Sequence, residues 1–146
     1  MSITFQIAGA TYTEGTEPCI CEPGEYPDGN FTVCPYCQGK GVCPTSVSNL
    51  PELNMSNLNA LDLLALINVG PVQSCGEWSA GALNQVHKNL MALMNTPKGE
   101  RFEVEPIQEG NFFMGGRSKQ YVDHRFNALL NIVVVAKQRG SEVFWA

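Results

Sequence analysis

The chain begins with a short alternation of apolar and polar positions. Ile3, Phe5 and Ile7 are separated by single polar residues. Successive side chains of a strand point to opposite faces, so this period of two is typical of a strand with one buried face. Residues 2–8 are therefore predicted to form a half-buried β-strand.

The first helical pattern lies in residues 54–71. Ser56 or Asn57 can cap the free amides at its start, Gly70 can take the left-handed conformation that ends a helix, and Pro71 cannot continue it. Leucine and alanine fill most of the segment between these signals and leave little polar face. The pattern predicts the central buried helix of the fold.

Two further helices follow from apolar residues spaced three and four positions apart. The first is predicted over residues 79–95, and the second over residues 118–138, ending at Gly140. A run of isoleucine and valine at residues 132–135 has strong strand preference, which competes with the helical prediction there.

Short strands are predicted between and after these helices. They cover residues 30–33, 101–105, 111–114 and 142–145. Strands scattered among helices, rather than alternating regularly with them, favour an α+β fold with short antiparallel strands over an α/β fold.

Five cysteines interrupt residues 9–49, a segment rich in Gly, Pro and Thr with little periodicity. Such a segment needs stabilisation from something other than an apolar core, and zinc bound by about four thiolates supplies it. Two short-spaced pairs can bind one ion, so a closed structural zinc site is favoured over reduced cysteines without metal or a redox pair. The expected ligands are Cys19, Cys21, Cys34 and Cys37, with Cys43 as an alternative ligand.

This site divides the chain into two predicted domains. Residues 1–47 would form a zinc-binding lobe with an N-terminal strand, and residues 48–146 a helical domain with short strands. The expected fold class is therefore α+β, with a zinc-knuckle lobe packed on a roughly three-helix core. A catalytic zinc is disfavoured because residues 1–86 contain no His and a four-thiolate site leaves no open position for water.

The segment CPYCQGKG at residues 34–41 resembles the Cys-x-x-Cys-x-Gly-x-Gly unit of the cysteine-rich domain in DnaJ-type chaperones. The resemblance implies the geometry of a zinc knuckle. That family uses four such units, whereas this chain has one and a degenerate second at residues 19–24. A chaperone role therefore does not follow from it.

Charge is sparse and unevenly distributed. Charged residues make up 16% of the chain, and nine basic residues stand against fourteen acidic ones. Residues 1–39 contain acidic residues and no Lys or Arg, whereas residues 115–140 are mainly basic. This balance does not supply the broad basic face of a nucleic-acid-binding domain. The uncharged polar surface suits hydrogen-bonded recognition or self-association into a homo-oligomer.

The chain shows no targeting signal. Its start lacks the basic region and long apolar region of a signal peptide, and no segment has the ~18 consecutive apolar residues of a membrane span. We therefore expect a soluble, cytoplasmic protein. Thiols are kept reduced in that compartment, which favours metal over disulfide for the cysteines.

A candidate anion site lies where the third helix should begin, at Gly116, Arg117, Ser118 and Lys119. A helix start carries partial positive charge, so cations there are unfavourable unless an anion or an acidic neighbour compensates. One hypothesis is that these residues hold the phosphate or carboxylate of a nucleotide-like ligand.

The simpler interpretation of the same segment is a glycine turn with Arg117 paired to Glu103, Glu105 or Glu109. A second group of polar residues, including Asn57 and Asn59, lies at the start of the first helix. Such residues are usually caps, but they could join the anion site if the two helix starts converge.

Evidence for catalysis is weak. His87 and His124 lie on predicted helices, where a lone His is usually a hydrogen-bonding residue at the edge of the core, and Cys75 is expected to be buried as a small apolar side chain. The chain contains no nucleophile elbow, paired-carboxylate motif or His-Glu-x-x-His. Binding is therefore favoured over enzymatic activity.

Residues 53–64 and 116–126, with the Trp145-Ala ending, resemble small uncharacterised proteins of bacteriophages and prophages. The resemblance implies a viral accessory protein in the bacterial cytoplasm that blocks a host enzyme or defence system. The first function hypothesis is a non-enzymatic protein that neutralises a host factor or sequesters an anionic nucleotide-like signal. The alternative is a zinc-stabilised adaptor or inhibitor that binds protein alone, and a zinc-dependent enzyme ranks third.

Overall fold

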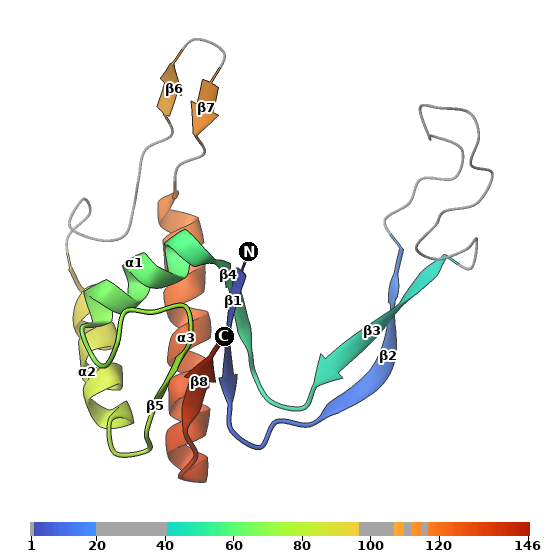
Figure 1. Cartoon of the computed structure of the whole chain (residues 1–146), viewed down its shortest axis with the longest axis horizontal. Coiled ribbons are helices and arrows are strands. Elements are labelled where there is room, and N and C mark those ends of the chain that lie inside the picture. Colours follow the sequence, from blue (N-terminus) through green and yellow to red (C-terminus); the bar gives the residue numbers. More distant parts are fainter. Residues whose placement is uncertain (1, 20–40, 97–106, 110–111, 115–116) are drawn as a thin grey trace. The chain divides into compact units, whose positions relative to one another are not determined.

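The computed structural model in Figure 1 describes residues 2–19, 41–96, 107–109, 112–114 and 117–146. The chain divides into two compact units, residues 1–10 with 50–146 and residues 11–49, which we call the core unit and the ribbon unit. Three helices and antiparallel sheets in the described residues confirm the α+β class. The first strand belongs to the core unit, whereas the sequence assigned it to the N-terminal lobe.

The core unit contains a four-stranded antiparallel sheet. Its members are β1 (Ser2–Ile7), β4 (Leu53–Ser56), β5 (Gly76–Trp78) and β8 (Val143–Trp145), in the order β4-β1-β8-β5. The predicted first and last strands are confirmed. The sequence did not predict β4, whose residues carry the signals of a helix start, or β5, which has three residues.

One face of this sheet is apolar and the other is mostly polar. Ile3, Phe5 and Ile7 are buried, and the register places them beside the buried residues of β4 and β8. The opposite face carries Thr4 and Gln6 of β1, other polar side chains and the exposed Phe144 of β8. The prediction that residues 2–8 form a strand with one buried face is therefore confirmed for β1.

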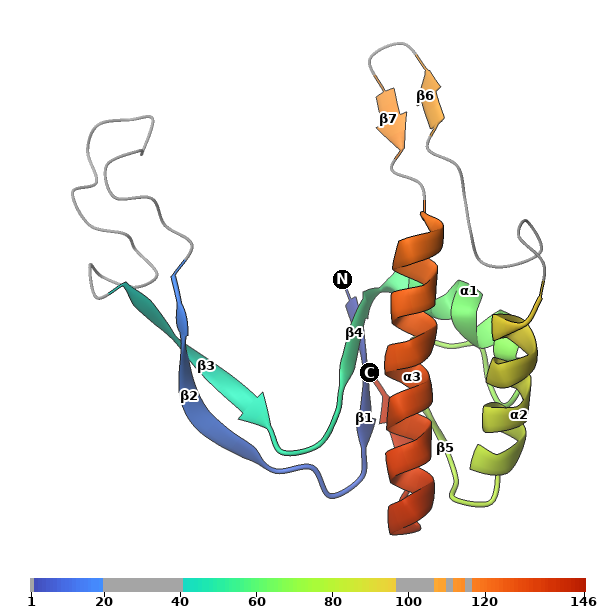
Figure 2. The same ribbon diagram turned by 180° about the vertical axis from the view of Figure 1, so that it is seen from behind.

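Three helices pack against the apolar face or against one another, namely α1 (Asn57–Ile67), α2 (Leu83–Met94) and α3 (Lys119–Arg139). The helices α1 and α3 contact the sheet, and α2 packs on both of them. Figure 2 shows α3 lying along the strands. None of the helices in the described residues is long and apolar enough to cross a membrane.

The third helix follows its prediction closely. Ser118 caps it, and its hydroxyl accepts a hydrogen bond from the backbone N–H of Tyr121 at 3.2 Å. Gly140 ends it in the left-handed conformation, with φ 62°. Ile132 and Val133 are buried inside the helix, so packing overrides their strand preference.

The first two helices differ from prediction in detail. The first ends at Asn68, which takes the left-handed conformation with φ 52°, two residues before Gly70. It is not buried all round, because Leu58 is 70% exposed and the buried residues lie on one side. The second helix starts at Leu83, after Ala82, rather than at residue 79.

Three aromatic rings form the centre of the core. Phe5, Trp78 and Trp145 have ring centroids 4.9–6.0 Å apart. The indole N–H groups donate to the backbone carbonyls of Val69 at 2.6 Å and Gln73 at 2.9 Å. Both buried indoles therefore satisfy their polar atom, which fixes the position of each ring.

The described part of the ribbon unit is a two-stranded antiparallel ladder, β2 (Tyr12–Pro18) and β3 (Val42–Ser48). Mutual hydrogen bonds between Thr11 and Asn49 close one end, and the N–H of Cys19 donates to Gly41 at the other end, at 2.9 Å. No side chain in its described residues is buried. The sequence did not predict this ladder.

A second hairpin pairs β6 (Ile107–Glu109) with β7 (Phe112–Met114). The strand expected at residues 111–114 is thereby confirmed for residues 112–114. The strands expected at residues 30–33 and 101–105 lie outside the described residues, as does the CPYCQGKG segment.

Candidate functional site

The starts of α1 and α3 lie side by side in the core unit. The Nδ2 of Asn59 donates to the Tyr121 hydroxyl at 2.9 Å, and the Nη1 of Arg117 donates to the Oδ1 of Asn59 at 3.1 Å. The sequence placed Asn59 and Arg117 at separate helix starts, and the structure brings them together. The sequence predicted that Asn57 and Asn59 could join the anion site only if the two helix starts converge, and the two starts do converge.

Arg117 forms an ion pair within this cluster. Its Nη1 lies 2.6 Å from the Oδ2 of Asp62, one turn along α1 from Asn59. The side chain of Arg117 is 16% exposed, so the pair is partly shielded from water. The sequence offered Glu103, Glu105 or Glu109 as the compensating residue. The structure pairs Arg117 with Asp62 of α1, while the side chains of those three glutamates are not among the described ones. An incoming anion would have to compete with this carboxylate.

The other predicted site residues make contacts within their own helix, or lie outside the described residues. Lys119 pairs with Asp123 one turn along α3. Ser118 uses its hydroxyl as the helix cap. Asn57 is half-buried at the start of α1, and its Oδ1 is a buried atom without a hydrogen-bond partner. Gly116 lies outside the described residues.

Sequence reasoning missed three members of the cluster, namely Asp62, Tyr121 and Arg125. The guanidinium carbon of Arg125 lies 4.9 Å from the centroid of the Tyr121 ring, and its Nη1 donates to the backbone carbonyl of Asn54 at 3.2 Å. Its Nε is buried without a hydrogen-bond partner. Arg117, Tyr121 and Arg125 are spaced four residues apart, and this helical spacing was the signal that could have grouped them.

Chemically, the cluster joins two helix starts through hydrogen bonds and one ion pair. Two cationic side chains next to two partly positive helix ends could attract an anion. However, Asp62 neutralises Arg117, and the Nη1 of Arg125 bonds to the strand β4. The contacts therefore favour a structural joint between α1, α3 and β4.

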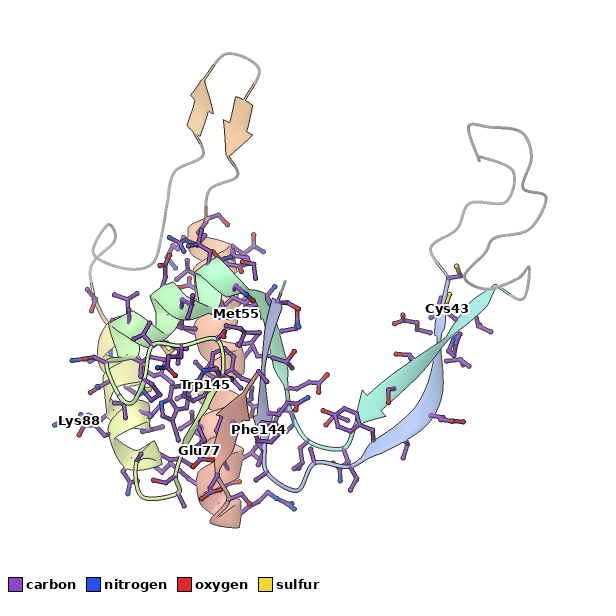
Figure 3. The ribbon with its side chains drawn as sticks, in the orientation of Figure 1. Cys43, Met55, Glu77, Lys88, Phe144 and Trp145 are labelled. Carbon is purple, nitrogen blue, oxygen red and sulfur yellow. The ribbon has the colours of Figure 1, made fainter. Side chains whose placement is uncertain are left out.

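The cysteines with described positions are Cys19, Cys43 and Cys75. Cys19 follows β2, Cys43 lies in β3, and both are half-buried. Figure 3 shows Cys43 at the end of the ladder from which residues 20–40 depart. The other expected ligands, Cys21, Cys34 and Cys37, lie outside the described residues, and within those residues no group of three metal-binding side chains occurs.

Three sequence expectations for individual side chains can be compared with the structure. Cys75 is exposed, so the expectation that it is buried is wrong. It lies in the segment before β5, where the neighbouring residues are also exposed. His87 is half-buried on α2 and His124 is exposed on α3. His124 therefore does not lie at the edge of the core.

No family model, curated protein or solved structure matches this chain. The resemblances to a DnaJ-type unit and to small phage proteins therefore stay predictions. Function has to be argued from the contacts and exposed surfaces described above.

Proposed function

We propose that this chain is a non-enzymatic binding protein that acts by protein contact, with a zinc-stabilised ribbon unit as its binding element. The observation that carries the proposal is the ladder of β2 and β3, which has no buried side chain in its described residues. An isolated two-stranded hairpin is at best marginally stable in water. Its persistence as a defined unit calls for additional stabilisation.

The surface of the ladder is suited to a protein partner. Tyr12, Val42 and Val47 are exposed by 44%, 41% and 52%. Glu14 and Glu17 are exposed on the same ladder, and its described residues contain no Lys or Arg. The register places Tyr12, Glu14 and Val42 on one face of the ladder and Glu17 and Val47 on the other. Each face therefore combines apolar side chains with a carboxylate and matches a partner surface that combines apolar side chains with basic ones.

Zinc is the proposed stabiliser of the end of the ladder at which Cys19 and Cys43 lie. Thiolates are soft ligands suited to zinc, and Cys19 and Cys43 lie half-buried where the ladder leads into the cysteine-rich segment. The sequence supplies Cys21, Cys34 and Cys37 between them. A structural zinc would contribute folding energy to a unit whose described residues have no apolar core.

The expected partner is a host protein. This part of the proposal rests on the resemblance to small phage proteins, which implies a viral protein that neutralises a host factor in the bacterial cytoplasm. An acidic binding element is compatible with that role because association with a basic target is accelerated by electrostatic attraction.

A matched pair of charge reversals tests the ribbon as the binding element. The double variant Glu14→Lys/Glu17→Lys changes two exposed carboxylates of the ladder, and Glu77→Lys/Glu142→Lys makes the same charge change on the core unit. We expect the first variant to lose partners that the unaltered chain recovers from bacterial lysate, and the second to retain them. Partner recovery unaffected by the ribbon variant would reject the proposal.

Binding of an anionic nucleotide-like signal is the second candidate. It is favoured by the convergence of two helix starts at Arg117 and Asn59. The test is thermal unfolding with a panel of linear and cyclic nucleotides. Asp62→Asn should remove a carboxylate that competes with an anion for Arg117 and so enlarge any stabilisation, whereas Arg117→Ala should remove it. No stabilisation of either the unaltered chain or Asp62→Asn would exclude this candidate.

A further inference from the structure

Hydrogen bonds at the two ends of the ladder show which backbone groups of β2 point away from β3. At one end, the N–H of Asn49 donates to the carbonyl of Thr11 at 3.0 Å. At the other end, the N–H of Cys19 donates to the carbonyl of Gly41 at 2.9 Å. Hydrogen-bonded and non-hydrogen-bonded pairs alternate along an antiparallel ladder, and the register between these ends is continuous. The odd-numbered residues of β2 therefore bond to β3, and the even-numbered residues direct their backbone groups outward.

Both prolines of the ladder agree with this alternation. Pro18 is opposite Val42 and Pro44 is opposite Thr16, and both pairs are of the non-hydrogen-bonded kind. A proline has no N–H, so a ladder accepts it where that N–H would have pointed outward. Pro44 therefore removes an outward donor from the middle of β3, which makes the outer edge of β3 a poor template for another strand.

The outer edge of β2 retains its donors in the corresponding stretch. Glu14 and Thr16 lie at consecutive outward positions, and both residues are exposed. Within the described residues, none of their backbone N–H and C=O groups has a hydrogen-bond partner. A row of such groups is the template on which the extended segment of another chain can add as a strand.

The side chains along this edge indicate what such a segment would contain. Glu14 lies on one face of the ladder and Glu17 on the other, whereas β3 has no charged residue. A Cβ atom at Gly15 would lie 3.2 Å from a methyl group of Val47, so this exposed valine reaches across to β2 between the two carboxylates. A strand added to β2 would therefore meet a carboxylate, then an apolar methyl group, and two positions later a second carboxylate.

We propose that the outer edge of β2 binds an extended segment of a partner protein as an added strand, in which two basic side chains stand three residues apart. This inference rests on the proposed function, in which the ribbon unit is the binding element, and it specifies the segment that is bound. The spacing follows from Glu14 and Glu17, whose opposite faces place the two basic side chains on opposite faces of the added strand. A second copy of this chain is disfavoured as the occupant, because two β2 edges would bring carboxylates together.

The probe is the peptide acetyl-Thr-Thr-Lys-Val-Val-Lys-Thr-Thr-amide, in which the lysine spacing is the same for both strand directions. It is titrated into the isotope-labelled full chain while backbone amide resonances are followed by NMR. We expect the amide protons of Glu14 and Thr16 to move downfield and to exchange more slowly with solvent, because each gains an acceptor. The amide of Ser46, which points outward from β3, is the matched control and should not change.

Altered peptides separate the backbone contribution from the side-chain contribution. N-methylation of the four central residues removes their amide donors and keeps their side chains, and it should abolish the changes at Glu14 and Thr16. Replacement of both lysines by glutamate should weaken binding at least about threefold, because like charges then face one another across the strands.

Two variants of the chain apply the same test from the other side. Thr16→Pro removes one outward N–H of β2 without removing a bond to β3, and it should lose peptide binding. Ser46→Pro makes the same change at the outer edge of β3 and should keep it. The amide resonances of Thr13 and Val47, a hydrogen-bonded pair, show whether the ladder persists in each variant. If Thr16→Pro disrupts the ladder, the N-methylated peptide decides the question on the unaltered chain.

The outcomes separate this inference from the proposed function. Unchanged Glu14 and Thr16 amides at millimolar peptide, or equal changes at Ser46, would overturn the added strand, as would undiminished binding of the N-methylated peptide. Partners from bacterial lysate that are lost with Glu14→Lys/Glu17→Lys but retained by Thr16→Pro would reject the edge and leave the ribbon as the binding element. Partners indifferent to the charge reversals would reject the proposed function itself.

Discussion

Gly76 shows how tightly single residues are constrained in the core unit. It lies opposite Trp145 in the register of β5 and β8. A Cβ atom added at Gly76 would come within 2.5 Å of the Trp145 ring. The ring cannot move freely, because its N–H donates to Gln73 and it packs against Trp78. The glycine is therefore required by the space that the indole occupies.

We expect Gly76→Ala to lower the free energy of unfolding by about 1–3 kcal/mol, as overpacking of a well-filled core usually does. Gly81→Ala is the matched control, since no atom lies within 4 Å of its added Cβ. That change should stay within about 0.5 kcal/mol. Chemical denaturation followed by tryptophan fluorescence measures both, and equal effects at the two sites would contradict the packing argument.

A double-mutant cycle can measure the joint between α1 and α3. Removing Arg117, Asp62 and then both should give a coupling energy of about 0.5–1 kcal/mol, because the pair is only partly shielded from water. The exposed pair of Lys119 and Asp123 within α3 is the comparison, with a coupling of at most about 0.5 kcal/mol. A coupling energy near zero for Arg117 and Asp62 would mean that their ion pair does not add to the stability of the fold.

At the scale of elements, local signals identified some parts of the fold and missed others. The limits of α3 follow from Ser118 and Gly140, whose effects act within one turn of the helix. The strand β4 has four residues and depends on pairing with β1, about fifty positions earlier in the chain. The ladder of β2 and β3 likewise depends on a register across an intervening segment. Local patterns contain no information about such long-range pairing.

The candidate site was predictable to a similar extent. Asn59 and Arg117 were identified because cap residues and cations at a helix start are local features. Asp62 and Arg125 were missed because their roles depend on the approach of α1, α3 and β4. The sequence could suggest that two helix starts were polar, but their meeting is a property of the packed core unit.

The helix caps offer a test at this scale. Ser118→Ala removes the hydrogen bond to Tyr121 and should cost about 1 kcal/mol of stability. Ser56→Ala changes the residue before α1, where the side chain makes no capping bond, and should cost only a few tenths. Thermal unfolding by circular dichroism compares the two, and an equal loss in both variants would refute the capping assignment.

At the scale of the whole molecule, stabilisation is divided between the two units. The buried apolar side chains of the described residues all belong to the core unit. The ribbon unit has none in its described residues and depends, in our proposal, on zinc. The two units should therefore respond independently to metal.

We expect a zinc chelator to increase proteolytic cleavage within residues 11–49 while leaving the thermal transition of the core unit unchanged. Both tryptophans of the chain, Trp78 and Trp145, are buried in the core unit, so their fluorescence reports on that unit alone. A chelator-induced drop in the tryptophan-monitored melting temperature would show that the core also depends on the metal.

The position of β8 also constrains the order in which the core unit can fold during synthesis. β8 lies between β1 and β5 in the sheet, although it is the last strand of the described chain. While a ribosome is still making residues 143–145, β1 and β4 can pair, but β5 has no neighbouring strand to join. The apolar residues opposite the gap then remain accessible to water and to chaperones. The sheet can therefore be completed only after residues 143–145 have been made.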